Sequence, residues 1–131
     1  MSEIKTFKSL LVANRGEIAA RIIKTSNYMG LNTIAVYTDA DAMSPHVSMA
    51  NEAINIGTGP IGDSYLSIEK IIDVAKKVGA DAIHPGYGFL SENHNFSEAC
   101  NSSGIVFIGP SPKSIELMGN KAQAKRIMKD A

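Results

Sequence analysis

The sequence has little of several features that define common protein classes. Its 131 residues include one cysteine, Cys100, so the chain can form no internal disulfide and suits a reducing compartment. Thirteen basic residues balance thirteen acidic ones, which leaves no basic field to attract nucleic acid or an anionic membrane surface. No apolar run approaches the roughly 20 residues that a membrane-spanning helix needs. We therefore expect neither nucleic acid nor a membrane as a partner.

The length and composition of the chain indicate a single folded domain. Apolar residues make up 44% of the chain and charged residues 20%, as in globular proteins rather than disordered ones. Residues 1–5 have neither the apolar core of a secretory signal nor the Arg-rich composition of an import leader. We expect a cytoplasmic protein, with the mitochondrial matrix as the alternative if a leader has been removed.

Short apolar runs alternate along the chain with segments of helical periodicity. The predicted strands span residues 7–13, 33–38, 53–56, 82–84 and 105–108, and the predicted helices residues 16–29, 67–78 and 93–100. This alternation predicts right-handed βαβ units and an open, mostly parallel sheet of about five strands. Because the strands are apolar throughout, helices should cover both faces of the sheet. The predicted fold class is therefore α/β.

The first predicted helix, residues 16–29, is amphipathic. Arg21 and Lys24 lie on its outer face, and Asn14 stands where a capping side chain belongs. Gly30 is placed to end the helix. The inner face is predicted to carry Ile18, Ala19, Ile22, Ile23 and Met29.

Two further helices are predicted within residues 110–131. Pro112 would occupy the first helical position of one, and Asn120 begins a capping-box pattern for the other. Lys121 then falls near a helix start, where its charge opposes the helix dipole. That position becomes favourable if an anion such as phosphate binds there, and otherwise Lys121 is an exposed lysine.

The most informative stretch is the glycine loop, residues 84–93, with the sequence HPGYGFLSEN. Its two glycines let the backbone pass close to a ligand, and Pro85 removes one backbone donor. The loop follows a predicted strand, so it should face the crevice where open α/β sheets bind ligands, presenting the phenol of Tyr87. Glu92 is either an ordinary first-turn acid of the next helix or a side chain that holds the loop or a cationic partner.

Other nucleotide sites are weakly supported. The turn at residues 13–17 has one glycine, so Asp39, at the position of a ribose-binding acid, is a poor signal for a dinucleotide. We favour a solvated turn for Asp39 and Asp41. A literal G-x-G-x-x-G at residues 57–62 is discounted, because Pro60 removes a needed N–H and the next helix starts several residues later. We expect a surface loop there, and no P-loop motif occurs.

The remaining polar groups do not predict a metal site. His46, His84, His94 and Cys100 show no metal-ligand spacing. Cys100 lies on the apolar face of a predicted helix, so we expect a buried thiol. No metal ligand is predicted in this chain.

Four runs of residues, in this order and at this spacing, resemble the biotin carboxylase family. They are ANRGEIA at 13–19, HPGYGFLSEN at 84–93, FIGP at 107–110 and LMGNK at 117–121. The resemblance covers about residues 7–131. It implies the Rossmann-like amino-terminal domain of an ATP-grasp enzyme, with a core of about residues 1–109 and helices in 110–131 that lead into the ATP-grasp core.

The resemblance also implies an activity and partners. The family uses ATP, Mg²⁺ (or Mn²⁺) and bicarbonate to carboxylate biotin held on a carrier domain; ATP activates bicarbonate as carboxyphosphate, which supplies CO₂ to the biotin ring nitrogen. The implied partners are the biotin carboxyl carrier domain, a carboxyltransferase component and a second copy of the enzyme, with Arg21 and Lys24 near the homodimer interface. Among possible acceptors we expect an acyl-CoA, because acyl-CoA carboxylases are the most numerous group.

Individual residues take roles by the same resemblance. Lys121 is implied to contact ATP phosphate, and Tyr87 and Gly88 to lie near the biotin ureido ring. The supporting loop also includes His84, Gly86 and Glu92. The family's glycine-rich lid, metal-binding glutamates and bicarbonate-binding arginine lie beyond the last residue, so we expect no catalytic residue within this chain and no activity from it alone.

Two other functions stay open at this stage. One is a different ATP-grasp ligase, for example one acting on purine precursors or carbamoyl phosphate. The other is a non-catalytic α/β module that binds a nucleotide or a protein partner. The ten consecutive residues of the glycine loop favour a biotin carboxylase over the first alternative.

Overall fold

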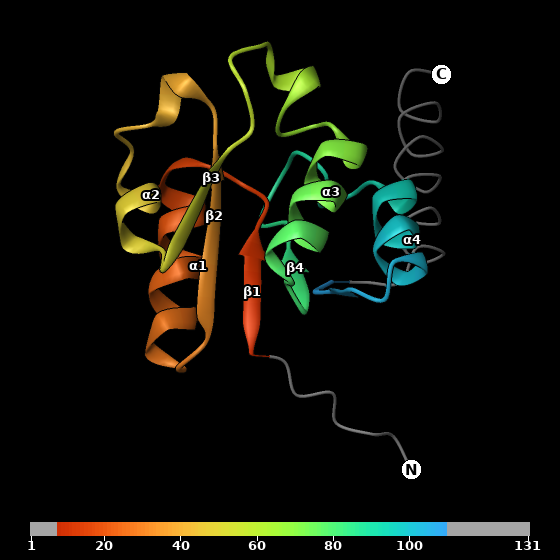
Figure 1. Ribbon diagram of the computed structural model, residues 1–131, viewed down its shortest axis with the longest axis horizontal. Coiled ribbons are helices and arrows are strands. Elements are labelled where there is room, and N and C mark those ends of the chain that lie inside the picture. The colour runs from red at the N-terminus through yellow and green to blue at the C-terminus, as the bar shows by residue number, and fades with distance from the viewer. Residues whose placement is uncertain (1–7, 110–131) are drawn as a thin grey trace, which may run out of the picture.

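The computed structural model of the chain describes residues 8–109 (Figure 1). Its strands are β1 (Ser9–Val12), β2 (Asn32–Tyr37), β3 (Glu52–Asn55), β4 (Ala82–His84) and β5 (Val106–Phe107). Its helices are α1 (Gly16–Tyr28), α2 (Pro45–Met49), α3 (Ile68–Val78) and α4 (His94–Ser102), with short 3-10 turns at η1 (Asp39–Asp41) and η2 (Ile61–Asp63).

The five strands form one sheet in the order β3-β2-β1-β4-β5, and every neighbouring pair is parallel. This confirms the predicted α/β class and strand number. The central strand β1 pairs with β2 on one side and β4 on the other, with Leu11 opposite both Ile34 and Ile83. The order along the chain runs outward from β1 in both directions, so it reverses between β1 and β4.

Helices cover both faces of this sheet, as predicted (Figure 1). Alternate residues of β1 point to opposite sides. Leu11 joins the larger core under α3 and α4, where Ile71 and Phe96 are fully buried. Leu10 and Val12 join the second core under α1.

The inner face of α1 is narrower than predicted. Ala19 and Ile23 are buried, whereas Ile18 is 39% exposed and Met29 is 68% exposed. Those two assignments were wrong because the buried stripe follows positions four and seven residues apart, through Ala19, Ile23 and Ser26. Met29 already lies beyond the last helical residue as the C-cap. The outward placement of Arg21 and Lys24 is confirmed.

The helix boundaries follow local capping chemistry. The Ser67 side chain accepts a hydrogen bond from the Lys70 backbone, and Gly79 ends α3 in the left-handed region at φ 69°. Asn93 caps α4 in the same way, through the Phe96 N–H. By contrast, the predicted cap of α1 was wrong: Arg15 is the N-cap residue, without a side-chain cap, and Asn14 bonds elsewhere.

Helix α2 was not predicted from the sequence. It has only five residues, and Pro45 takes its first turn. It packs beside α1 on the same face of the sheet (Figure 1). Its contribution to the fold is His46, which is fully buried.

The amino-terminal end of the β1–β4 pair is fastened by Asp81. One carboxylate oxygen accepts the backbone N–H groups of Lys8 and Ser9, at 2.9 and 3.1 Å, and the Ser9 hydroxyl. These hydrogen bonds favour the carboxylate, so the two backbone donors hold the pKa of Asp81 below its usual value.

Some predictions fall on residues outside the described range. They include the start of the first strand at Phe7, the turn and helices of residues 110–131, and Lys121. Within residues 8–109, no helix combines the length and apolarity that crossing a membrane requires.

Candidate functional site

The candidate site lies where β1 and β4 end. Because the strand order reverses between these two strands, the segments that follow them turn away to opposite faces of the sheet at its carboxyl edge, which is where open α/β sheets bind ligands. The last backbone hydrogen bond between the β1 and β4 segments is donated by the Ala13 N–H to the His84 carbonyl at 2.9 Å. Asn14 and the glycine loop come next.

Asn14 joins these two segments. It is 1% exposed, and its Nδ2 donates to the carbonyls of Pro85 and Tyr87, both at 2.8 Å. Its Oδ1 accepts the Arg15 N–H at 2.8 Å. Sequence analysis assigned this side chain to helix capping. A polar residue directly after a buried strand was the signal for a role at the sheet edge.

The glycines of the loop serve different purposes. Gly86 has φ 69°, and a Cβ there would lie 2.6 Å from Asn14 Nδ2, so both torsion and space require glycine. Gly88 has φ 74°, but a Cβ would meet nothing within 4 Å, so only its backbone torsion favours glycine. The close approach predicted for a ligand is, at Gly86, an approach to Asn14. Phe89 also has a positive φ, 46°, which is unusual for a bulky residue.

The far side of the glycine loop is open. Tyr87 is 79% exposed, and Gly88 and Glu92 are exposed as well. Glu92 precedes the N-cap of α4, which has no acid in its first turn, so the interpretation as a first-turn acid was wrong. The loop therefore presents a phenol and a carboxylate at the carboxyl edge, as predicted.

His84 supports the loop from the strand side. Its Nδ1 accepts the Gly86 N–H at 3.0 Å, which requires an unprotonated Nδ1. The half-buried ring also borders an apolar pocket of about 350 Å³ between α1 and the sheet. Desolvation in this setting lowers the pKa of His84 below its usual 6.5.

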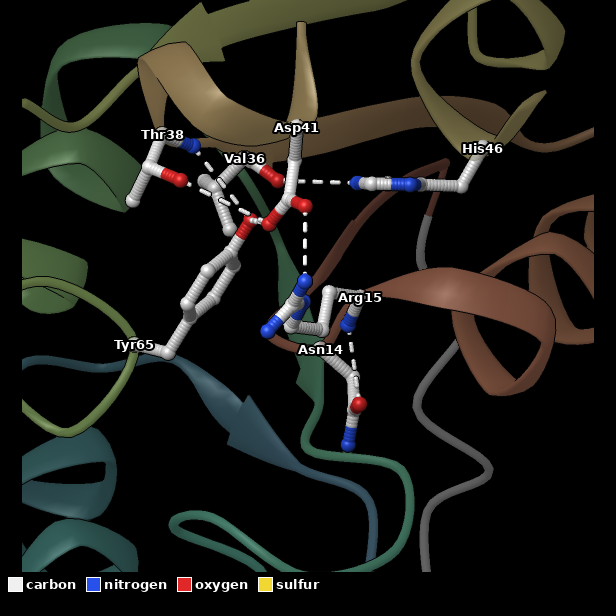
Figure 2. Close-up of polar contacts among 7 residues, drawn as sticks. All are labelled: Asn14, Arg15, Val36, Thr38, Asp41, His46 and Tyr65. Atoms are coloured by element: carbon white, nitrogen blue, oxygen red, sulfur yellow. Dashed lines mark hydrogen bonds and ion pairs between the residues drawn. The ribbon is translucent and has the colours of Figure 1, made fainter. Parts of the chain in front are cut away.

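A second polar cluster lies beside Asn14 (Figure 2). Its centre is Asp41, which is 6% exposed. One carboxylate oxygen pairs with the Arg15 guanidinium at 2.8 Å, and the other accepts the Tyr65 hydroxyl at 2.7 Å. The prediction of a solvated turn was therefore wrong for Asp41, although Asp39 is exposed as expected.

Tyr65 is held as a hydrogen-bond donor in this cluster. Burial and the bond to Asp41 raise the pKa of Tyr65 to about 12, so the phenol keeps its proton. Its oxygen accepts the Thr38 N–H at 3.3 Å. The Arg15 guanidinium lies 5.8 Å from the centre of the Tyr65 ring, within the range of a cation–π contact.

The other candidate side chains stand apart from the site. His46 Nε2 contacts the Val36 carbonyl at 3.2 Å, which ties α2 to β2 (Figure 2). Cys100 is buried on α4, as predicted, and burial raises the pKa of its thiol to about 12. The segment at residues 57–62 is a largely exposed loop. Across residues 8–109, no three His, Cys, Asp or Glu side chains gather as a metal site would require.

Comparison with known proteins identifies the family. The model of the biotin carboxylase N-terminal domain matches residues 6–115. This chain belongs to the biotin carboxylase family. The 2-oxoglutarate carboxylase small subunit of Hydrogenobacter thermophilus is 54% identical over 95% of the chain, and the propionyl-CoA carboxylase alpha chain of Ruegeria pomeroyi is 50% identical over 95%. The chain spans only 26% and 18% of these two relatives.

A solved structure agrees in fold. The biotin carboxylase domain dimer of the Hydrogenobacter thermophilus 2-oxoglutarate carboxylase superposes with a TM-score of 0.87 at 52% identity. The match covers 97% of this chain and 28% of that one, which is in complex with MgADP, ADP and bicarbonate. The resemblance drawn from the four sequence runs is thereby confirmed at the level of family and fold.

Tyr65→Phe should destabilise the protein by about 1–3 kcal/mol, because the buried Asp41 carboxylate loses a donor and the Thr38 N–H loses its acceptor. The free energy of unfolding, measured in denaturant, tests this. The matched control is Tyr28→Phe, since the Tyr28 side chain is exposed. Equal stability of the two variants would show that the Tyr65 hydroxyl does not stabilise the fold.

Acid should weaken the fold partly through His84. Its pKa is lowered in the folded state, so below about pH 6.5 the unfolded chain binds the proton first and stability falls as the pH decreases through the folded pKa. His84→Asn keeps an acceptor near the Gly86 N–H but cannot titrate. Melting temperatures of both proteins between about pH 8 and pH 5 should converge as the pH falls; parallel curves would argue against the role of His84.

Proposed function

We propose that the full-length protein containing this chain is a biotin carboxylase that carboxylates carrier-bound biotin with ATP and bicarbonate. The observation that carries the proposal is an open glycine loop at the strand-order reversal of a chain that belongs to this family. In the reaction, bicarbonate takes a phosphoryl group from ATP and the resulting carboxyphosphate releases CO₂ to the biotin nitrogen.

The loop residues are proposed to form one wall of the biotin site. Tyr87 and Gly88 lie beside the ureido ring, which suits their exposure at the carboxyl edge of the sheet. His84 and Gly86 shape the backbone that carries them. Glu92, exposed at the same edge, has a supporting role. Lys121 is proposed to bind ATP phosphate, and Mg²⁺ accompanies the nucleotide, as MgADP does in the related Hydrogenobacter thermophilus domain.

The partners follow from the same reaction. A biotin carboxyl carrier domain brings the biotin, and a carboxyltransferase component consumes the carboxybiotin. We propose a homodimer that uses the outer face of α1, where Arg21, Lys24 and Tyr28 are exposed; the related domain is a dimer. An acyl-CoA is the proposed acceptor, and the cytoplasm or the mitochondrial matrix the proposed location, since related methylcrotonoyl-CoA carboxylase subunits are mitochondrial.

The direct test uses full-length protein, MgATP, labelled bicarbonate and biotin. We expect label to enter biotin in an ATP-dependent reaction, with release of ADP. Reactions without biotin or without Mg²⁺ serve as controls. ATP hydrolysis that never transfers label to biotin, or to a biotinylated carrier domain, would contradict the proposal.

Lys121→Ala in the full-length enzyme should raise the KM for ATP. One lost charge-assisted phosphate contact costs about 1.5–3 kcal/mol. Steady-state kinetics with varied ATP measure the change, and Lys77→Ala, which removes an exposed lysine of α3, is the control. ATP kinetics that match the control would remove Lys121 from the nucleotide site.

A further inference from the structure

We propose that Asn14 is a positioning residue for the biotin site: it fixes Tyr87 and Gly88 through hydrogen bonds to the loop backbone and does not itself contact substrate. The inference rests on the proposed function, because the loop matters to catalysis only if biotin binds beside it. It assigns a function to the first strand–helix turn, which lies 71 to 73 residues from the carbonyls it binds.

The contact geometry supports this role. Both Nδ2 hydrogens are used, one on the Pro85 carbonyl and one on the Tyr87 carbonyl, so the amide bridges the carbonyls of the two residues on either side of Gly86. Gly86 approaches so closely that a Cβ would lie 2.6 Å from Nδ2. Since Asn14 is buried, water cannot readily replace these bonds, and the lower local dielectric strengthens them.

The amide is also held in one orientation. Its Oδ1 accepts the Arg15 N–H, so a flip would turn two acceptors toward each other at the Pro85 carbonyl and two donors toward each other at Arg15. Arg15 is in turn anchored to Asp41, which binds Tyr65 (Figure 2). In Figure 2 the Asn14 amide nitrogen points away from this cluster.

The loop depends on such an external contact. Gly86, Gly88 and Phe89 all have positive φ, a region that costs free energy for a bulky residue unless the surroundings impose it. Tyr87 is largely exposed, so its side chain does little to hold the peptide. Together with the His84 bond to the Gly86 N–H, the two bonds from the buried Asn14 amide connect the loop backbone to the body of the domain. The Asn14 amide alone binds the Tyr87 carbonyl directly among these contacts.

The test is Asn14→Asp in the full-length enzyme. The replacement has nearly the same shape but offers only acceptors to the two carbonyls. We expect kcat/KM for biotin to fall by roughly tenfold or more, since two hydrogen bonds are lost. The KM for ATP and the bicarbonate-dependent ATP hydrolysis without biotin should stay within about twofold, because these steps do not use the loop.

Asn27→Asp is the matched control. Its Nδ2 donates to the Met49 carbonyl at 2.9 Å, so the same atom exchange removes one side chain–backbone bond from α1, at an exposed position away from the glycine loop. Both variants lose stability, but only Asn14→Asp should change kcat/KM for biotin. Asn14→Ser keeps one donor, so its kcat/KM for biotin should lie between those of wild type and Asn14→Asp. If the aspartate variant does not fold, the serine variant by itself tests the proposal.

The outcomes separate the two proposals. A wild-type enzyme with no biotin-dependent carboxylation defeats the proposed function. A wild-type enzyme that carboxylates biotin, together with Asn14 variants whose biotin kinetics match Asn27→Asp, overturns the positioning role. A loss shared equally by the ATP and biotin steps also overturns it, because a general structural defect gives that pattern.

Discussion

The carboxyl edge of this domain depends on one buried amide. Parallel strands satisfy each other's backbone groups as far as Val12 and His84, but the reversal of strand order then sends the two following segments apart. Backbone carbonyls beyond that point need donors from elsewhere. The Asn14 amide donates to two such carbonyls and accepts one backbone N–H. Its side chain therefore continues the hydrogen bonding between the β1 and β4 segments where the strands end.

The two ends of the β1–β4 pair leave different backbone groups without a partner in the sheet: N–H groups at the amino end and carbonyls at the carboxyl end. At the amino end Asp81, an acceptor, binds the free N–H groups of Lys8 and Ser9 in an exposed position. At the carboxyl end Asn14, chiefly a donor, binds free carbonyls in a buried one. The difference follows strand polarity, and only the second arrangement is shielded from water. The glycine loop, which we propose to line the biotin site, is held from this buried end.

Features that depend on residues close together in the sequence could be predicted from it. Features that depend on contacts between residues far apart in the sequence could not. Alternating apolar runs predicted the five strands, and the helix starts predicted at residues 67 and 93 lie within one residue of those of α3 and α4, because the capping by Ser67 and Asn93 is local. Asp41 looked like a turn residue because its partners, Arg15 and Tyr65, lie 26 and 24 positions away. Asn14 was misassigned for the same reason, and α2 was too short for periodicity to reveal.

The hydrogen bonds of Asp41 indicate what its buried carboxylate does beside the site. The Arg15 side chain is 41% exposed, so solvent screens its ion pair with Asp41. The attraction between the two charges therefore contributes little to stability, and stability alone does not account for Arg15 and Asp41. Apolar contacts, however, do not fix orientation, whereas the bonds from Tyr65 through Asp41 to Arg15 do. The Arg15 backbone N–H selects which end of the Asn14 amide faces the loop, so donors rather than an acceptor meet the carbonyls of the residues on either side of Gly86. The Asp41 cluster holds the side chain of this same Arg15.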